Sequence, residues 1–360
     1  MKRTTTMTKL KNLTKVLLLL FVVSSQGQFV RKGLESAPAI PTATIPDIPV
    51  TEEMVNHQDA AIERITFQAK AHEASDEMIT RNGYFVKRKN APATILVCHG
   101  YMCDKFDIAF IRTIFSKYNC MTFDFRAHGE GIENQQCTFG KEEAFDVIGA
   151  VEYLKTRPEV AGKPIISYAF SMGSVSSIEA QAREPMFDAM ILDCPFDSSD
   201  NLIKKGLSNL KLNILGYEFK LPGQRMLQKY AYSPYVQSLL KAMLKAVAKF
   251  DARDINTNIM PVTPVTSASK ISVPCYFITC KNDEKVSVEA VTSVFSKTTG
   301  YKRLWITNGR RHFDSFFYNP EKYMYEVNTF VQKAIKGSLK HDHSAKIFAD
   351  PDEDRRGEAS

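Results

Sequence analysis

The sequence predicts an α/β protein with a doubly wound, mostly parallel sheet and a helical cap insertion. Two observations lead to this fold class. Short, continuously apolar segments alternate with amphipathic helical segments, and one long stretch interrupts the alternation. Strands of a parallel sheet are apolar along their whole length because helices cover both faces of the sheet. The 360 residues are 44% hydrophobic and 24% charged, which is typical of a folded globular chain.

The first 27 residues have the pattern of a secretory signal peptide. A basic stretch through Lys15 precedes the apolar run 16–23, and the small residues Ser25 and Gly27 follow. The run holds eight apolar residues, whereas spanning a bilayer takes about 20. We therefore expect cleavage and export, to the periplasm or the exterior. A membrane tether formed by an uncleaved signal is the alternative.

The net charge of +7 also originates mainly in this segment. Five of the 47 basic residues lie within residues 1–27, which hold no acid, so the remainder has 42 basic against 40 acidic residues. A nearly neutral chain offers no electrostatic footprint for a polyanion. Nucleic acid is therefore not an expected partner.

The elements of the sheet and its helices can be placed from the apolar patterns. Helical spacing is clear in Ala144, Val147 and Val151, for example. We predict parallel strands at 94–98, 120–125, 164–169, 187–192, 274–279 and 301–306, and leading antiparallel strands at 65–70 and 84–87. We predict helices at 104–117, 142–155, 172–183 and 321–335.

Three segments depart from this alternation. Residues 196–268 contain the helically spaced stretch Leu239–Ala248, which predicts a helical insertion over the sheet. It serves either as a packing cap or as a lid that lines an acyl or aromatic pocket. Residues 28–57 are rich in Pro, Thr and Ser and predict an extended linker, whereas the charged residues 338–360 predict a disordered tail. The main domain is thus expected over 58–337.

The cysteines indicate neither a metal site nor a disulfide framework. The seven residues include no CxxC pair and no Cys/His spacing typical of zinc ligands. Most lie in or beside apolar strands, so buried free thiols are the expected state. If the protein is exported, Cys103 and Cys137 are the alternative candidates for a disulfide. We expect no metal and no cofactor.

The run Ala169-Phe-Ser171-Met-Gly173 lies where a predicted strand meets a predicted helix. A sharp strand-to-helix turn exposes a serine hydroxyl, and the helix N-terminus stabilises negative charge beside it. The turn requires small residues two places before and after the serine, which Ala169 and Gly173 provide. Ser171 is therefore the predicted nucleophile.

Partners for this serine follow other strands. An oxyanion hole typically combines the backbone N–H after the nucleophile with one from a loop after an earlier strand. Met172 and Tyr101 of the His99-Gly-Tyr101 run fit these positions. His99 itself is expected to order this loop, although a catalytic role is the alternative.

Asp283 follows a predicted strand and His312 follows the last one. A carboxylate fixes the tautomer of a histidine base, and histidine titrates near neutrality. Asp283 is thus the predicted acid, with Glu284 as its alternative, and His312 is the predicted base; a buried structural histidine is the competing interpretation.

These residues, in the order Ser, Asp, His, resemble the α/β-hydrolase superfamily over about residues 62–335. The chain is most similar to the serine-aminopeptidase-like and lysophospholipase or monoacylglycerol-lipase-like groups. Residues 124–131 resemble the D-x-R-G-H-G-x-S turn of these groups, in which Arg126 and His128 are expected to be structural. Gly140, Glu143 and Asp146 match a G-x-x-E-x-x-D helix start, and 268–274 resembles the lead into the acid-bearing strand. The departures are Ala169, Cys280, Ala127 and Gly131.

The resemblance implies a serine hydrolase that cleaves a small-molecule acyl ester, thioester or lipid ester through an acyl-enzyme. Serine at position 171 favours acyl transfer over dehalogenase or epoxide-hydrolase chemistry, which would use aspartate there. A peptidase or amidase of the serine-aminopeptidase type is the first alternative. A non-catalytic binding module on the same fold is the second. The basic and apolar cap also suits a lipid or membrane-surface substrate.

Overall fold

The computed structural model describes residues 60–131, 135–209, 211–214, 217–220, 224–238 and 255–351. The predicted signal peptide, the linker and the Leu239–Ala248 stretch lie outside these residues. The chain divides into two compact units, 56–206 with 225–360, and 1–55 with 207–224. Within the described residues, no helix is both long and apolar enough to cross a membrane.

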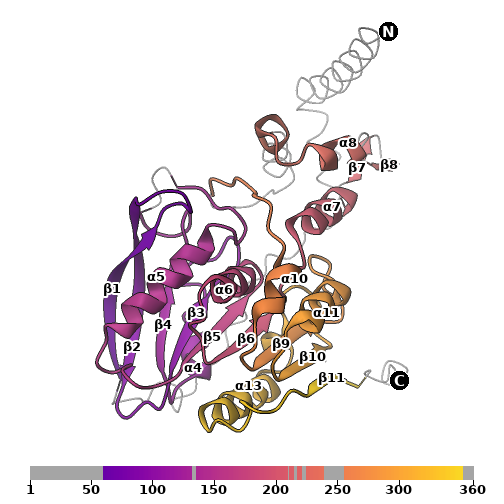
Figure 1. Cartoon of the computed structure of the whole chain (residues 1–360). Coiled ribbons are helices and arrows are strands. Elements are labelled where there is room, and N and C mark those ends of the chain that lie inside the picture. Colours follow the sequence, from indigo (N-terminus) through magenta and orange to yellow (C-terminus); the bar gives the residue numbers. More distant parts are fainter. Residues whose placement is uncertain are drawn as a thin grey trace. The chain divides into compact units, whose positions relative to one another are not determined.

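The larger unit is built on a nine-stranded sheet of order β1-β2-β4-β3-β5-β6-β9-β10-β11 (Figure 1). The strands are β1 (Ala60–Lys70), β2 (Met78–Arg88), β3 (Thr94–Cys98), β4 (Asn119–Phe123), β5 (Ile165–Phe170), β6 (Ala189–Asp193), β9 (Cys275–Cys280), β10 (Lys302–Thr307) and β11 (Ala345–Ala349). β1 and β2 form an antiparallel hairpin, and β2 is antiparallel to β4. All other neighbours are parallel, which confirms the predicted fold class.

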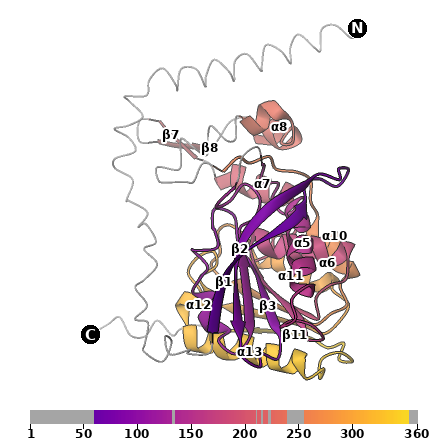
Figure 2. The same cartoon turned by 90° about the vertical axis from the view of Figure 1, so that its left-hand side faces the viewer.

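Helices cover both faces of the sheet, because alternate strand residues point to opposite faces. Phe277 of β9 contacts Phe295 of α11, whereas the preceding residue, Tyr276, contacts Phe330 of α13 on the other face. Figure 2 shows α5, α6, α10 and α11 together on one side of the strands. The helices are α4 (Ile111–Ile114), α5 (Glu143–Lys155), α6 (Met172–Arg183), α7 (Ser199–Asn209), α8 (Gln224–Lys229), α10 (Pro264–Ser267), α11 (Val288–Lys297), α12 (Ser315–Tyr318) and α13 (Pro320–Ile335), with a short 3-10 helix η1 (Ala268–Lys270).

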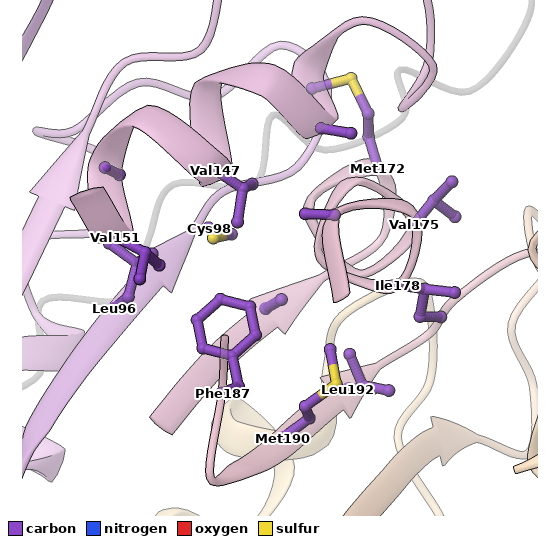
Figure 3. Packing of buried hydrophobic residues seen from close by; sticks show 14 of the residues in the cluster. Leu96, Cys98, Val147, Val151, Met172, Val175, Ile178, Phe187, Met190 and Leu192 are labelled. Carbon is purple, nitrogen blue, oxygen red and sulfur yellow. The ribbon is translucent and has the colours of Figure 1, made fainter. Parts of the chain in front are cut away.

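The core between the sheet and α5 and α6 positions the central strands, of which β3 is the neighbour of the strand that leads to the predicted nucleophile. Val147 and Val151 of α5 lie near Leu96 and Cys98 of β3, and Val175 of α6 belongs to the same buried cluster (Figure 3). All five side chains are essentially inaccessible to solvent. Burying a side chain of this size contributes roughly 1.5–3 kcal/mol, so the ends of these strands are firmly positioned.

The helix predicted over 104–117 is wrong for most of its length. Only α4 is helical, and turns precede it. Asp104 accepts hydrogen bonds from the N–H groups of Phe106 and Asp107, and Asp107 accepts one from the N–H of Asp104. Such side-chain acceptors compete with helical backbone bonds, so apolar spacing alone did not decide the structure here.

The region from 196 to 268, predicted as helical, also contains strands. In the smaller unit, β7 (Lys211–Ile214) pairs antiparallel with β8 (Tyr217–Lys220), with Leu212 opposite Phe219. Apolar residues alternate with polar ones on both sides of Gly216, and this period of two is the strand pattern.

The prediction of a disordered tail from residue 338 is wrong for the residues up to 351. β11 pairs in parallel with β10 at the edge of the sheet, and Phe348 stacks on Trp305. The Nε1–H of Trp305 donates to Asp350 at 3.0 Å, and the ammonium of Lys322 forms an ion pair with the same carboxylate. The composition of this segment predicted disorder because two adjacent apolar residues, Ile347 and Phe348, do not make a recognisable strand pattern. The strand forms because it pairs with β10 at the edge of the sheet.

Candidate active site

The predicted nucleophile occupies a strained turn between β5 and α6. Ser171 has φ 53° and ψ −122°, a left-handed backbone that non-glycine residues rarely adopt. The first turn of α6 lies so close to the end of β3 that a Cβ on Gly173 would lie 2.2 Å from the carbonyl oxygen of Cys98. The space therefore admits glycine alone at this position, while the fully buried Ala169 fits on the other side.

Ser171 begins a continuous chain of hydrogen bonds. Its Oγ lies 2.8 Å from Nε2 of His312, and Nδ1 of His312 lies 2.6 Å from Oδ2 of Asp283. The side chain of Asp283 is fully buried, whereas that of His312 remains 15% exposed. The tautomer in which Nδ1–H donates to the carboxylate leaves Nε2 free to accept the serine proton. The structure thus brings together the three residues predicted from the sequence, and Glu284 is not in this chain.

Asp283 is held as an anion. Its Oδ1 accepts the backbone N–H groups of Lys285 at 2.8 Å and Val286 at 2.9 Å. Burial raises the pKa of Asp283, but the hydrogen bond and charge of His312 together with these N–H donors outweigh it, so the pKa lies below its ordinary value. A permanently ionised carboxylate stabilises the imidazolium that forms when His312 takes a proton.

The predicted oxyanion donors flank the serine. Gly100 packs against the turn so closely that a Cβ on it would lie 3.4 Å from the Cβ of Ser171. Tyr101 follows Gly100, and Met172 is the first residue of α6. Within the described part of the chain, neither backbone N–H of these two residues has an acceptor. An oxyanion that develops beside Ser171 would require two such donors.

Two further histidines fix the loop that carries Tyr101. His99 accepts the N–H of Phe125 at Nε2 (3.0 Å), and its Nδ1 lies 2.8 Å from the carbonyl oxygen of Gly100. His128 accepts the N–H of Met102 at 3.3 Å. These contacts fit the structural role predicted for both residues. Arg126 is likewise structural, because its buried guanidinium binds Asp146 of α5 at 2.9 Å.

A buried ion pair also contacts the segment that follows β3. The ammonium of Lys105 lies 2.5 Å from Asp124, and both side chains are fully buried. Asp124 also accepts the backbone N–H of Lys105 at 2.8 Å and that of Glu130 at 3.3 Å. The pair therefore joins the segment after β3 to the turn after β4.

Sequence reasoning missed two features beside these residues. Phe170 and Phe313, which flank the serine and the histidine in the chain, stack with ring centroids 3.9 Å apart. An aromatic residue next to each functional residue is the only sequence signal for this stack. The second feature is the end of β6, where Asp193 and Cys194 are buried, and where burial raises the pKa of Asp193 to about 7. No local motif marks it.

None of the seven cysteines, all of which lie within the described residues, forms a disulfide. Cys137 is buried, and its Sγ lies 3.5 Å from the sulfur of Met172, whereas Cys103 is partly exposed. The alternative Cys103–Cys137 disulfide is not formed in this structure.

Comparisons with known proteins match this architecture. The chain is 26% identical over 254 residues, 69% of its length and 74% of the relative's, to the uncharacterized protein YqkD of Bacillus subtilis. Among solved structures it resembles the esterase Pf2001 of Pyrococcus furiosus, with a TM-score of 0.57 and 18% identity over 79% of this chain and 95% of that one. It also resembles the acylaminoacyl peptidase of Pyrococcus horikoshii, with a TM-score of 0.53 and 15% identity over 81% of this chain and 44% of the peptidase. No protein-family model matches the sequence.

The sheet order, the strained serine turn and these structural likenesses define the class. The chain has the fold of the α/β-hydrolase superfamily.

Proposed function

We propose that the protein is a serine hydrolase that cleaves a carboxylic ester through an acyl-enzyme at Ser171. The observation that carries the proposal is the hydrogen-bond chain from Ser171 through His312 to Asp283, with distances of 2.8 and 2.6 Å. A serine hydroxyl is a weak nucleophile unless an adjacent base takes its proton. The chain supplies both the base and the carboxylate that orients it.

In the proposed reaction, His312 removes the proton of Ser171 as Oγ attacks the ester carbonyl. The oxyanion that results accepts the backbone N–H groups of Tyr101 and Met172; loss of one such donor raises the barrier by about 3 kcal/mol in related chemistry. His312 then gives its proton to the departing alcohol. In the second half, a water molecule deprotonated by His312 attacks the acyl group and restores Ser171.

Esters are favoured over amides by the charge of the region that follows β6. Residues 196–268 hold ten basic and five acidic residues, so few carboxylates are available to bind the free amine of a peptide. The same composition suits an ester with an anionic or lipid-like group. Cleavage of amides is the second candidate, because the chain shares its fold with an acylaminoacyl peptidase.

The test is turnover of p-nitrophenyl esters from acetate to palmitate, with matched p-nitroanilides, by the full chain. Ser171→Ala should abolish turnover, whereas Ser174→Ala should retain it, since the Ser174 hydroxyl donates to the carbonyl oxygen of Asp193 and not to the histidine. The preferred chain length would size the acyl site, and preference for long chains would indicate a lipid substrate. Cleavage of the anilides alone would replace the ester proposal by the amidase. Equal turnover by Ser171→Ala and the parent would refute both.

We further propose that the protein is exported by residues 1–27. The support is the order of basic, apolar and small residues in the sequence. N-terminal sequencing of the protein recovered from its native host should begin after this segment. Recovery of the intact N-terminus in the membrane fraction would favour the uncleaved tether, and intact protein in the cytosol would contradict export.

A further inference from the structure

A buried thiol lies beside the aspartate and histidine of the candidate active site. Cys194 follows β6, Asp283 follows β9, and His312 follows β10. These strands are parallel, so all three residues lie at the carboxyl ends of neighbouring strands. One ligand atom from each residue lies within 4.8 Å of the other two. Cys194 and Asp283 are buried and His312 is partly buried.

The backbone holds Cys194 in this place. Its N–H donates to the carbonyl oxygen of Ile278 at 2.9 Å, which continues the pairing of β6 with β9. Its φ of 50° is left-handed, a conformation that residues with a Cβ rarely adopt. The thiol donates to Asp193 at 3.0 Å. These contacts place the sulfur beside the neighbouring carboxylate and imidazole.

We propose that Cys194, Asp283 and His312 form a binding site for a thiophilic divalent cation, Zn²⁺ or Cd²⁺, whose occupancy blocks Ser171. The inhibitory part rests on the proposed function, whereas the site itself does not. A thiolate, an imidazole and a carboxylate form a ligand set that suits Zn²⁺, and the thiolate selects against Mg²⁺ and Ca²⁺. A water molecule completes the tetrahedron.

The positions of the three groups are compatible with this ligand set. Bonds of about 2.0–2.3 Å in a tetrahedron place ligand atoms roughly 3.3–3.8 Å apart. The 2.6 Å between Nδ1 of His312 and Oδ2 of Asp283 must therefore widen. A separation near the 4.8 Å limit must close by about 1 Å. Asp283 keeps its Oδ1 bonds to two backbone N–H groups, and Oδ2 turns to the metal. One thiolate and one carboxylate neutralise the divalent charge, which lowers the cost of burying it.

Metal binding would disable the base by changing its tautomer. The cation takes the Nδ1 lone pair of His312, so the imidazole proton moves from Nδ1 to Nε2. The thiol of Cys194 releases its proton to solvent, and the metal gains a thiolate. Nε2–H then faces Oγ of Ser171 at 2.8 Å and cannot accept the serine proton. The expected result is reversible loss of nucleophilic reactivity.

The site is tested first by direct binding of CdCl₂ to the full-length protein. The parent should show a cadmium–thiolate charge-transfer band that saturates at one ion per chain. Cys194→Ser should lose the band. Cys280→Ser is the matched control, because its buried thiol shares a hydrogen bond with Cys194 but does not belong to the trio. Absence of the band in the parent, or its loss in Cys280→Ser alone, would overturn the site; the parent titration decides this even if a variant misfolds.

The inhibitory role is tested by fluorophosphonate labelling in the presence of ZnCl₂, each variant being compared with its own metal-free rate. Zn²⁺ should suppress labelling of the parent, EDTA should restore it, and MgCl₂ should have no effect. In Cys194→Ser the Zn²⁺ concentration for half-suppression should rise at least about tenfold, since even outer partners of metal ligands contribute 10–100-fold in affinity. Equal suppression in both proteins would refute the role of Cys194. Failure of the metal-free parent to label would refute the proposed function while the cadmium band still reports on the site.

Discussion

Replacing Lys105 by Met should destabilise the protein far more than breaking any exposed ion pair. Lys105 and Asp124 are both fully buried and lie 2.5 Å apart. The substitution preserves most of the side-chain volume but leaves a buried carboxylate without its counter-charge. Removing one partner of a buried pair costs about 3–5 kcal/mol, because desolvation of the remaining charge is no longer offset.

The lower end of that range applies here. Asp124 keeps two backbone donors, the N–H groups of Lys105 and Glu130. We therefore expect a loss of about 3 kcal/mol in the free energy of unfolding. At roughly 2 °C per kcal/mol for a large domain, the melting temperature should fall by about 6 °C. Lys105→Met with Asp124→Asn should cost less than the sum of the single changes by at least ~1.5 kcal/mol, since the double variant leaves no unpaired charge.

The assay is urea or thermal unfolding followed by circular dichroism, with Arg64→Met as the control. Arg64 forms a 2.6 Å ion pair with Glu130, but the two side chains are 62% and 43% exposed. Exposed pairs contribute at most about 1 kcal/mol. If Lys105→Met shifts the transition no more than Arg64→Met, burial of the Lys105–Asp124 pair is not what stabilises this loop, and the reasoning fails.

Three other predictions follow from the site and from the edge of the sheet. Asp283→Asn should lower kcat on the best ester by roughly 10⁴-fold with little change in stability, because the neighbouring imidazole adopts the wrong tautomer; an unchanged kcat would remove Asp283 from the mechanism. Burial lowers the pKa of His128 below its ordinary value of 6.5. Neutral His128 therefore stabilises the folded protein above pH 6.5, and this stabilisation is lost as the pH falls through the lowered pKa. His128→Asn should therefore lose less unfolding free energy than the parent between pH 7 and pH 5, and parallel losses would contradict this. Ending the chain at residue 344 should expose the lone Trp305 and shift its fluorescence to longer wavelength, whereas an unshifted spectrum would mean that β11 does not cover it.

Continuous apolar runs were sufficient to predict the central strands. β3, β5, β6 and β9 are buried along their whole length, and such strands are visible as uninterrupted apolar segments. The apolar spacing at 104–117 predicted a helix wrongly, because hydrogen bonds to the side chains of Asp104 and Asp107 stabilise turns there. β11 was missed for a different reason, because its stability comes from β10 and Trp305, which are distant in the sequence.

Some residues of the candidate site could be predicted from the sequence and one could not. Ser171, Asp283 and His312 are recognisable because each follows a strand end and their chemistry requires those residue types. Cys194 follows a strand end as well, but a single cysteine there has no sequence signature. Its proximity to Asp283 and His312 appears only when strand order brings β6, β9 and β10 together.

The central claim is that Ser171 is an activated nucleophile. It is tested most directly by treating the folded full-length protein with a fluorophosphonate and locating the adduct by peptide mass spectrometry. We expect one adduct per chain, on Ser171, that is absent in Ser171→Ala and His312→Ala and present in Ser174→Ala. A folded parent that forms no adduct, or one that carries it on another residue, would contradict the account.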